Sequence, residues 1–380
     1  MDQISTCLRN GAKDGLPGQV VLVLQGGGAV GAYQAGVYEA LHDAGIEPDW
    51  VIGTSIGAIN GAIIAGNAPE RRLVSLREFW KRVERMNRSA IQPWSWLGSL
   101  AGNVDTLLRG VPGFFSPNPA AYWGMLTPIG LNRAAFYSAE DLRSTLSEVI
   151  DIERLGSSPH VRITVGAVNV RTGRMHYFDS RSQPIGIAHI LGSSALPPAL
   201  PAVEIEGGSF WDGGIYSNTP IEAVFDDQPR RDSVVFAIQL WPASGPAPNS
   251  IWQVLARQKE IQYASRTLSH IARQKQIHQL RHIIRELVGR LPPDQRDTPE
   301  IGELTAYGCG TTMHIIELDA PRLNGEDHMR DIDFTTAGIT ARWEAGYNDA
   351  QRTLNRKPWQ VEVDPMVGVA VHGPEEAPVS

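Results

Sequence analysis

Two short apolar runs near the start of the chain each pass through a glycine-rich turn into a helical pattern. The first run, 19–25 (QVVLVLQ), is rich in valine, which is typical of a strand buried on both faces of a parallel sheet. Residues 31–44 then place apolar side chains at helical spacing. A second run, 50–52, passes through 53–57 (GTSIG) into a helix of small residues at 58–65. This order of strand, helix, strand and helix predicts a three-layer α/β fold with a mainly parallel sheet.

The rest of the chain predicts more strands and a helical C-terminal part. The remaining predicted strands are short apolar runs, at 161–170, 175–178, 233–240 and 313–318, of which the first two form a hairpin. The proline-rich stretch 241–249 marks a boundary. Beyond it, a helical period over 251–288 predicts one long or two shorter amphipathic helices, and a further helix is expected around 337–354.

Residues 92–124 form an irregular segment that carries six aromatic side chains among glycine and proline. A long segment without secondary structure is usually disordered or functional, and the aromatic content argues against disorder. Two interpretations stay open. The segment is either a lid or lipid-facing lip, or a covering loop whose aromatic side chains pack on the core.

Composition and charge narrow the class of protein. Of the 380 residues, 42% are hydrophobic and 20% are charged, as in an ordinary globular protein. The net charge of -7 argues against a general nucleic-acid binder, which would be basic.

The cysteines and the apolar runs bear on the compartment. Because Cys7 and Cys309 lie far apart in the sequence, we expect no disulfide framework and no cysteine-based zinc site, which fits a reducing compartment. Residues 1–18 contain no apolar core segment of a secretory signal, and no apolar run reaches the length of a membrane span. We therefore expect a cytoplasmic protein that meets lipid, if at all, from the membrane surface.

The first glycine turn, at 26–31 (GGGAVG), fits two chemistries. It satisfies G-x-G-x-x-G between a strand and a helix, which is the context of a dinucleotide-binding fingerprint. That interpretation needs an acidic residue at the end of the next strand, whereas Asp49 comes before that strand. Alternatively, the backbone N–H groups of the turn, at a helix N-terminus, suit a transient oxyanion.

The second turn favours the oxyanion. Residues 53–57 match G-x-S-x-G at a strand-to-helix junction, the pattern of a nucleophile elbow. Gly53 and Gly57 leave room for a tight turn that exposes the hydroxyl of Ser55. With a triple-glycine turn one β-α unit upstream, the pattern indicates a serine nucleophile rather than a dinucleotide site.

A serine nucleophile needs a base, and the sequence favours an aspartate over a histidine. Several later histidines fall on polar helices, where we expect them to face solvent, or inside a strand: His270, His278, His282 and His314. Asp212 instead ends a strand before Gly213 and Gly214, where the lack of side chains lets another element approach closely. A turn aspartate that caps its own backbone is the alternative role for Asp212.

At these residues the sequence resembles the patatin-like phospholipases. The turn 26–31, the elbow 53–57 and Asp212-Gly213-Gly214 occur in the order of that family, and 193–197 (SSALP) is similar to its proline loop. The resemblance implies a three-layer α/β/α fold and a Ser-Asp dyad that uses no histidine, metal or other cofactor. Its implied site comprises Ser55 as nucleophile, Asp212 as general base, Gly26, Gly27 and Gly28 as oxyanion hole, and the supporting residues Gly31, Gly53, Gly57, Gly213 and Gly214.

Two positions depart from the family pattern. Gln25 stands where the family commonly has aspartate, and Val30 stands where it has a basic residue. Gln25 can still orient the turn through hydrogen bonds. The missing cation at Val30 weighs against an anionic headgroup close to the scissile ester, and so bears on phospholipid as substrate rather than on hydrolysis.

The resemblance also divides the chain. It implies a patatin-like catalytic domain at 19–241 after an N-terminal tail at 1–18, and a mainly helical C-terminal domain at 250–372 before a tail at 373–380. Residues 257–290 hold eight Lys or Arg against two Glu. This stretch is either a solvated helix docked on the catalytic domain or a basic amphipathic helix that lies on an anionic membrane or lipid particle.

Together these features predict a lipid acyl hydrolase that works through an acyl-enzyme intermediate. We expect a lipid or other acyl ester as substrate, transient contact with a membrane or lipid particle, and no nucleic-acid partner, cofactor or metal. Two alternatives remain: an acyltransferase that uses the same dyad, and a catalytically weak lipid-surface binder that uses the aromatic segment and the basic helices.

Overall fold

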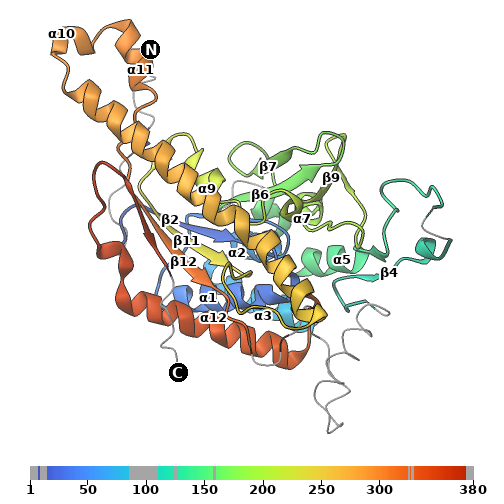
Figure 1. Cartoon of the computed structure of the whole chain (residues 1–380). Helices are drawn as coiled ribbons and strands as arrows, with labels where there is room; N and C mark the ends of the chain where they lie inside the picture. The colour runs from blue at the N-terminus through green and yellow to red at the C-terminus, as the bar shows by residue number, and fades with distance from the viewer. Residues whose placement is uncertain are drawn as a thin grey trace.

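A nine-stranded mixed sheet forms the centre of the molecule (Figure 1). The computed structural model describes residues 7–8, 15–84, 110–123, 126–156, 160–323, 326 and 329–373. The strand order is β13 (Val369–His372), β12 (Met313–Asp319), β11 (Ser233–Gln239), β2 (Gln19–Leu24), β3 (Trp50–Gly53), β6 (Arg162–Asn169), β9 (Gly208–Asp212) and β8 (Val203–Ile205), with β7 (Met175–Asp179) also paired to β6. Neighbouring strands from β13 to β6 are parallel, whereas β7, β8 and β9 add antiparallel pairs. The predicted mainly parallel sheet and the predicted β6–β7 hairpin are confirmed.

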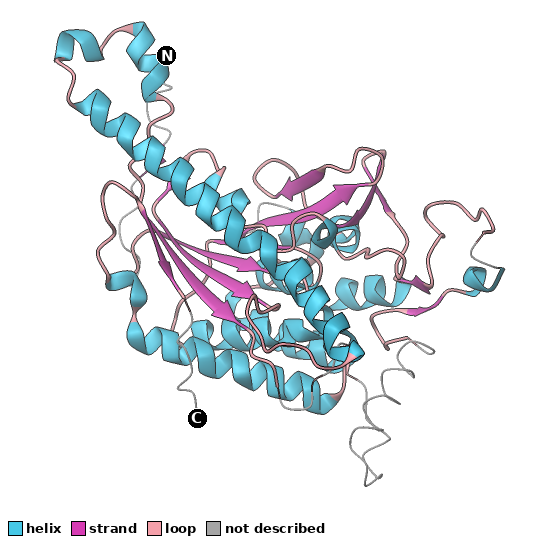
Figure 2. Ribbon diagram, viewed as in Figure 1, coloured by secondary structure: helices cyan, strands magenta, loops and turns pink. Residues whose placement is uncertain are grey.

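Helices cover both faces of this sheet (Figures 1 and 2). The longer ones are α1 (Ala32–Asp43), α2 (Ile56–Ala65), α3 (Pro69–Arg82), α5 (Glu140–Val149), α9 (Ile251–Gly289) and α12 (Thr336–Arg356). The shorter ones are α6 (Ile152–Gly156), α7 (Ile187–Ser193), α8 (Glu222–Phe225), α10 (Pro293–Arg296) and α11 (Pro299–Thr305). Residues 251–288 thus lie in one long helix, the first of the two predicted alternatives.

The core is split by the sheet into two apolar clusters. Along β2, Leu22 and Leu24 belong to the larger cluster with α1, α2 and α12, whereas Val21 and Val23 belong to a smaller cluster with α8 and α9. Alternate residues of a strand point to opposite faces, and both faces of β2 are covered. The valine-rich run at 19–25 therefore has no polar alternation, and the three-layer α/β/α fold is confirmed.

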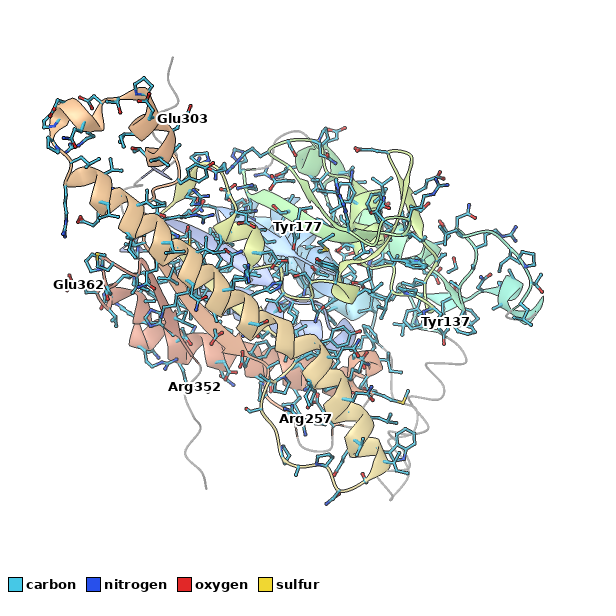
Figure 3. All side chains as sticks on the ribbon, turned by 45° about the horizontal axis from the view of Figure 1, so that its top comes forward. Tyr137, Tyr177, Arg257, Glu303, Arg352 and Glu362 are labelled. Atoms are coloured by element: carbon cyan, nitrogen blue, oxygen red, sulfur yellow. The ribbon has the colours of Figure 1, made fainter. Side chains whose placement is uncertain are left out.

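The chain after residue 249 extends the same sheet. β12 and β13 pair beyond β11, and α12 packs on α1. A side chain at Gly36 or Gly346 would overlap the backbone of the other helix, which explains how closely these two helices cross. α9 crosses the face of the sheet opposite α1, and its C-terminal end projects from the body together with α10 and α11 (Figure 1). Arg257, near the start of α9, and Glu303, in α11, lie far apart at the two ends of this helical stretch (Figure 3). That residues 19–241 and 250–372 form two separable domains stays a prediction.

The expectation of no disulfide is wrong. Cys309 is disulfide-bonded, and the sequence holds one other cysteine, Cys7. β1 (Cys7–Leu8) pairs with β10 (Arg230–Arg231), which leads into β11, and Cys309 precedes the neighbouring β12. Parallel strands bring their starting ends to one edge of the sheet, so cysteines far apart in sequence lie at the same edge. The cysteine argument for a reducing compartment no longer holds.

The aromatic segment is described from residue 110 onward except for 124–125, so Trp94 and Trp96 lie outside the described residues. Phe114 is buried, and its ring lies 6.5 Å from that of Phe79 and 5.4 Å from that of Phe334. This part of the segment packs on the core, as the covering-loop interpretation expects. No helix in the described part of the chain combines the length and apolar character of a membrane span.

Candidate active site

Ser55 lies in the turn between β3 and α2, at the carboxyl end of the parallel strands. Its backbone has φ 58° and ψ -126°, a combination that costs energy for a residue with a side chain. The turn is held because Ser55 N donates to Ser193 O and Oγ, both at 3.1 Å. A side chain at Gly53 would overlap the backbone of Gly57, and one at Gly57 would overlap that of Leu24. The glycines of G-x-S-x-G thus permit the tight turn that the sequence predicts.

Asp212 lies at the end of β9 and is 1% exposed. The side chain of Ser55 lies close enough to the carboxyl group to favour its charged form, and Asp212 Oδ1 accepts a 2.7 Å hydrogen bond from Gly214 N. Burial raises the pKa of Asp212 to about 7, against the opposing effect of these two contacts. Gly213 meets the backbone of Gly166, the close approach expected at this position. Asp212 therefore both contacts Ser55 and caps its own turn.

The glycine turn lies against the same serine. A Cβ atom at Gly26 would lie 3.0 Å from Ser55 Cβ and would overlap Asn218 Oδ1. Gly28 has φ 56° and opens η1 (Gly28–Gly31), the 3-10 helix that leads into α1. Within the described residues, the N–H groups of Gly27 and Gly28 donate no hydrogen bond to a protein oxygen. Such N–H groups at a helix start can bind a negative oxygen.

Gln25 holds the glycine turn in place through hydrogen bonds of its side chain. The side chain is fully buried; its Nε2 donates to Thr219 Oγ1 at 2.7 Å, and its Oε1 accepts hydrogen bonds from the backbone N–H groups of Leu240 and Trp241. The expected orienting role of Gln25 is confirmed. Val30 is also buried, so an uncharged side chain suits its position.

Three contributors to this site were not found from the sequence. Asn218 Nδ2 and Trp241 Nε1 donate to Gly26 O at 3.0 and 2.8 Å, and Ser193 Oγ donates to Gly166 O at 2.6 Å. Ser193 lies in the proline loop that the family resemblance picked out, so that signal was present. Asn218 and Trp241 follow strands at the same sheet edge as Ser55, which is the one signal that could have found them.

His278, His282 and His314 lie away from the site. His278 and His282 are buried, so the expectation that they face solvent is wrong: this side of α9 docks on the sheet, and both Nε2 atoms lie within 3.0 Å of Thr311 O. Thr311 precedes β12, whereas Ser55 follows β3, so the pair lies at the opposite edge of the parallel sheet. His314 lies in β12, as predicted.

Asp49 also lies at that opposite edge. It precedes β3, and its Oδ2 accepts a 2.9 Å hydrogen bond from Val20 N. The end of β3, where a dinucleotide site needs its acidic residue, is followed by Thr54 and Ser55, which speaks against the dinucleotide interpretation. The described residues bring together no group of three His, Cys, Asp or Glu side chains suited to a metal ion.

Comparison with known proteins shows the family of this chain. Residues 22–225, more than half of the chain, match the family model described as "Patatin-like phospholipase", and 261–366 match one described as "Patatin phospholipase". The chain is 28% identical over 221 residues to a cGAMP-activated phospholipase of Pseudomonas aeruginosa, covering 54% of this chain and 55% of that protein. It is 24% identical over 250 residues to the Lysophospholipase NTE1 of Candida glabrata, covering 64% of this chain and 12% of that protein.

The chain thus spans about half of the bacterial relative and a small part of the fungal one. Among solved structures, VipD from Legionella pneumophila aligns with 92% of this chain and 70% of its own at 15% identity. Its TM-score of 0.37 is too low to support an argument.

Proposed function

The chain belongs to the patatin-like phospholipase family, and from this membership and the geometry around Ser55 we propose that it is a serine acyl-ester hydrolase acting on lipid or related acyl esters. One observation carries the proposal: Ser55, on a strained elbow, lies beside the buried carboxyl group of Asp212 and favours its charged form. A serine hydroxyl is a weak nucleophile until an adjacent base accepts its proton.

The proposed reaction has two halves. Ser55 Oγ attacks the ester carbonyl while Asp212 accepts the hydroxyl proton. The carbonyl oxygen becomes an oxyanion that the amides of Gly27 and Gly28 stabilise, since Gly26 N already donates to Asn218 O. The tetrahedral intermediate collapses, the alcohol leaves with the proton from Asp212, and an acyl-enzyme remains. Water then attacks the acyl group, with Asp212 as base again, and releases the acid and free Ser55.

The environment of Asp212 supports its role as the base. A general base works best when its pKa lies near the working pH, and a solvated aspartate, with a pKa near 4, is too weak. Burial brings the pKa of Asp212 to about 7. The carboxylate is therefore both present and basic at neutral pH.

Exposed apolar side chains support contact with a lipid surface. The first turns of α9 expose Ile251 and Trp252, at 80% and 56%, together with Val254 and Leu255. Trp252 is an amphipathic aromatic residue of the kind that anchors proteins at membrane interfaces. We include transient binding to a membrane or lipid particle in the proposal.

A fluorophosphonate probe tests the nucleophile. The wild type, Ser55→Ala and Asp212→Asn are incubated with the probe, and any adduct is located by mass spectrometry. We expect an adduct on Ser55 in the wild type, none in Ser55→Ala, and slow labelling in Asp212→Asn. A folded wild type that does not label, or hydrolysis that survives Ser55→Ala, would refute the proposal.

Two added measurements separate the alternatives. An alcohol acceptor added to the ester assay yields a new ester if the protein is an acyltransferase and only free acid if it is a hydrolase. A lipid-surface binder without catalysis instead predicts salt-sensitive vesicle binding that survives Ser55→Ala and no ester turnover.

A further inference from the structure

Two side chains hold the carbonyl group of Gly26 in place. One of them, Trp241, follows β11, the last strand of the predicted catalytic domain. Asn218 Nδ2 donates to Gly26 O at 3.0 Å, and Trp241 Nε1 donates to the same oxygen at 2.8 Å. The peptide between Gly26 and Gly27 is planar and trans, so Gly27 N–H points opposite to Gly26 C=O. Whatever fixes the carbonyl oxygen of Gly26 therefore fixes the direction of the Gly27 amide.

The indole of Trp241 is held in turn by residues from the C-terminal region. Tyr263 of α9 stacks on it, with ring centroids 5.2 Å apart and ring planes 27° apart. Two cations lie against the same ring: Lys259 Nζ is 5.4 Å and Arg330 Cζ 5.0 Å from its centroid. Cations are attracted to the face of an indole, so these contacts favour one ring position.

A second contact runs directly from this region to the turn. Arg330 is buried and donates from Nη2 to Leu240 O at 2.7 Å, which places η4 (Arg330–Ile332) beside the end of β11. The backbone carbonyl of Asp331 lies against Gly28 so closely that a side chain at Gly28 would overlap it. Lys259 Nζ bonds to Asp331 Oδ2 at 2.6 Å and joins α9 to η4.

We propose that the C-terminal region clamps the oxyanion turn, with Trp241 and Tyr263 as positioning residues that aim the Gly27 amide at the reacting oxygen. The inference rests on the proposed function, because it takes the 26–28 turn as the oxyanion hole. It assigns a role to the region after residue 249, which family resemblance left open. Neither positioning residue touches the substrate in this scheme.

Kinetics of four variants test the clamp. Trp241→Phe keeps a ring but removes the N–H group that reaches Gly26, Tyr263→Leu removes the stacking ring, and Tyr263→Phe restores that ring without the hydroxyl. Tyr307→Leu is the matched control, because Tyr307 is a tyrosine of the same region that is 69% exposed. kcat and KM are measured on a soluble p-nitrophenyl ester, and the rate of fluorophosphonate labelling of Ser55 is measured alongside.

The clamp predicts a loss in kcat rather than in substrate binding. We expect Trp241→Phe to lower kcat about 10- to 100-fold and Tyr263→Leu about 10-fold, both with KM changed less than about 2-fold, since misaimed oxyanion donors weaken the transition state alone. Tyr263→Phe and Tyr307→Leu should stay near the wild type. Unchanged kcat in Trp241→Phe, or equal losses in Tyr263→Leu and Tyr263→Phe, would overturn the clamp.

Hydrogen exchange keeps the inference separate from the hydrolase proposal. The amides of Gly26 and Val30 are hydrogen-bonded in the turn, to Asn218 O and Gly27 O. The clamp predicts faster exchange of a peptide spanning 25–31 in Trp241→Phe and Tyr263→Leu, whether or not any ester is hydrolysed. If the wild type hydrolyses no ester but the two variants exchange faster than the wild type, the hydrolase proposal is refuted and the clamp stands. If exchange in the variants is unchanged, the clamp is overturned. If Trp241→Phe does not fold, the half-buried Tyr263→Leu site provides the same readouts.

Discussion

Replacing Asp212 with asparagine should abolish turnover and stabilise the folded protein, by an amount that grows as the pH rises from 3.8 to about 7. Asparagine has a similar shape, and its carbonyl oxygen can still accept the hydrogen bond from Gly214 N. It cannot accept the proton of Ser55. It also removes a carboxylate that is 1% exposed and whose ionisation the folded state opposes.

The magnitude follows from the pKa of Asp212, which burial raises from 3.8 to about 7. Below pH 3.8 the group is protonated in both states and costs nothing. As the pH rises towards 7, the unfolded chain releases the proton while the folded protein retains it, so stability falls until the folded group ionises as well. The full cost is about 4 kcal/mol at pH 8 and about 2 kcal/mol at pH 5, at about 1.4 kcal/mol per pKa unit.

Urea unfolding at pH 5 and pH 8 measures this difference. Asp212→Asn should exceed the wild type in free energy of unfolding by about 2 kcal/mol more at pH 8 than at pH 5, with an unchanged m-value. Asp294→Asn, which replaces an exposed aspartate of α10, is the control and should show no such pH-dependent gain. In the wild type, kcat/KM should fall about tenfold per pH unit below pH 7. An inflection near pH 4, or equal stability differences at both pH values, would refute the reasoning.

Three further changes probe other parts of the molecule. Gly26→Ala should lower kcat/KM by about 100-fold, because the added Cβ overlaps Asn218 Oδ1 and displaces the turn. Gly302→Ala is the control and should leave kcat/KM unchanged, because the space around Gly302 is open. Ester turnover measures both variants. Trp252→Ala should lower the affinity for anionic vesicles, measured by co-sedimentation, about fivefold, since the apolar contact of a half-exposed indole with lipid is lost. Unchanged affinity would refute contact between α9 and lipid. Cys309→Ser should lower the melting temperature of the oxidised protein and abolish its response to a thiol reductant, which a thermal melt in both redox states measures.

The parts of the site that could be predicted from the sequence are those encoded within single turns. The elbow at 53–57 and the turn at 26–31 each combine a strand end, a glycine requirement and a helix start, and these are local properties of the chain. The glycines are needed because added side chains would overlap neighbouring atoms: the backbone of Gly57 at Gly53, of Leu24 at Gly57 and of Asp331 at Gly28. Asp212 was found in the same way, from a strand end followed by two glycines.

The parts that could not be predicted depend on contacts between distant segments. Trp241 contacts Gly26 although the two residues are 215 positions apart in the sequence. Its stacking partner Tyr263 lies on α9, and the polar sequence of α9 does not indicate which side of the helix packs on the sheet. The buried histidines of α9 were misassigned for the same reason: His278 and His282 cover the sheet edge with a side of the helix that carries no continuous apolar stripe. Amphipathic periodicity identifies a helix reliably only when the docking face is apolar.

The proposed dyad without histidine accounts for the way distant parts of the chain meet at one edge of the sheet. The carboxylate has to be the base itself, and only burial makes an aspartate basic enough at neutral pH. Burial, and after it the charge of Asp212, raises the pKa of Tyr263 of α9 to about 12, so this phenol stays neutral near the dyad. The same helix stacks Tyr263 on Trp241, which orients the oxyanion turn. Under this scheme the region after residue 249 is part of the catalytic apparatus, because α9 carries the ring that orients the amide groups expected to receive the developing charge.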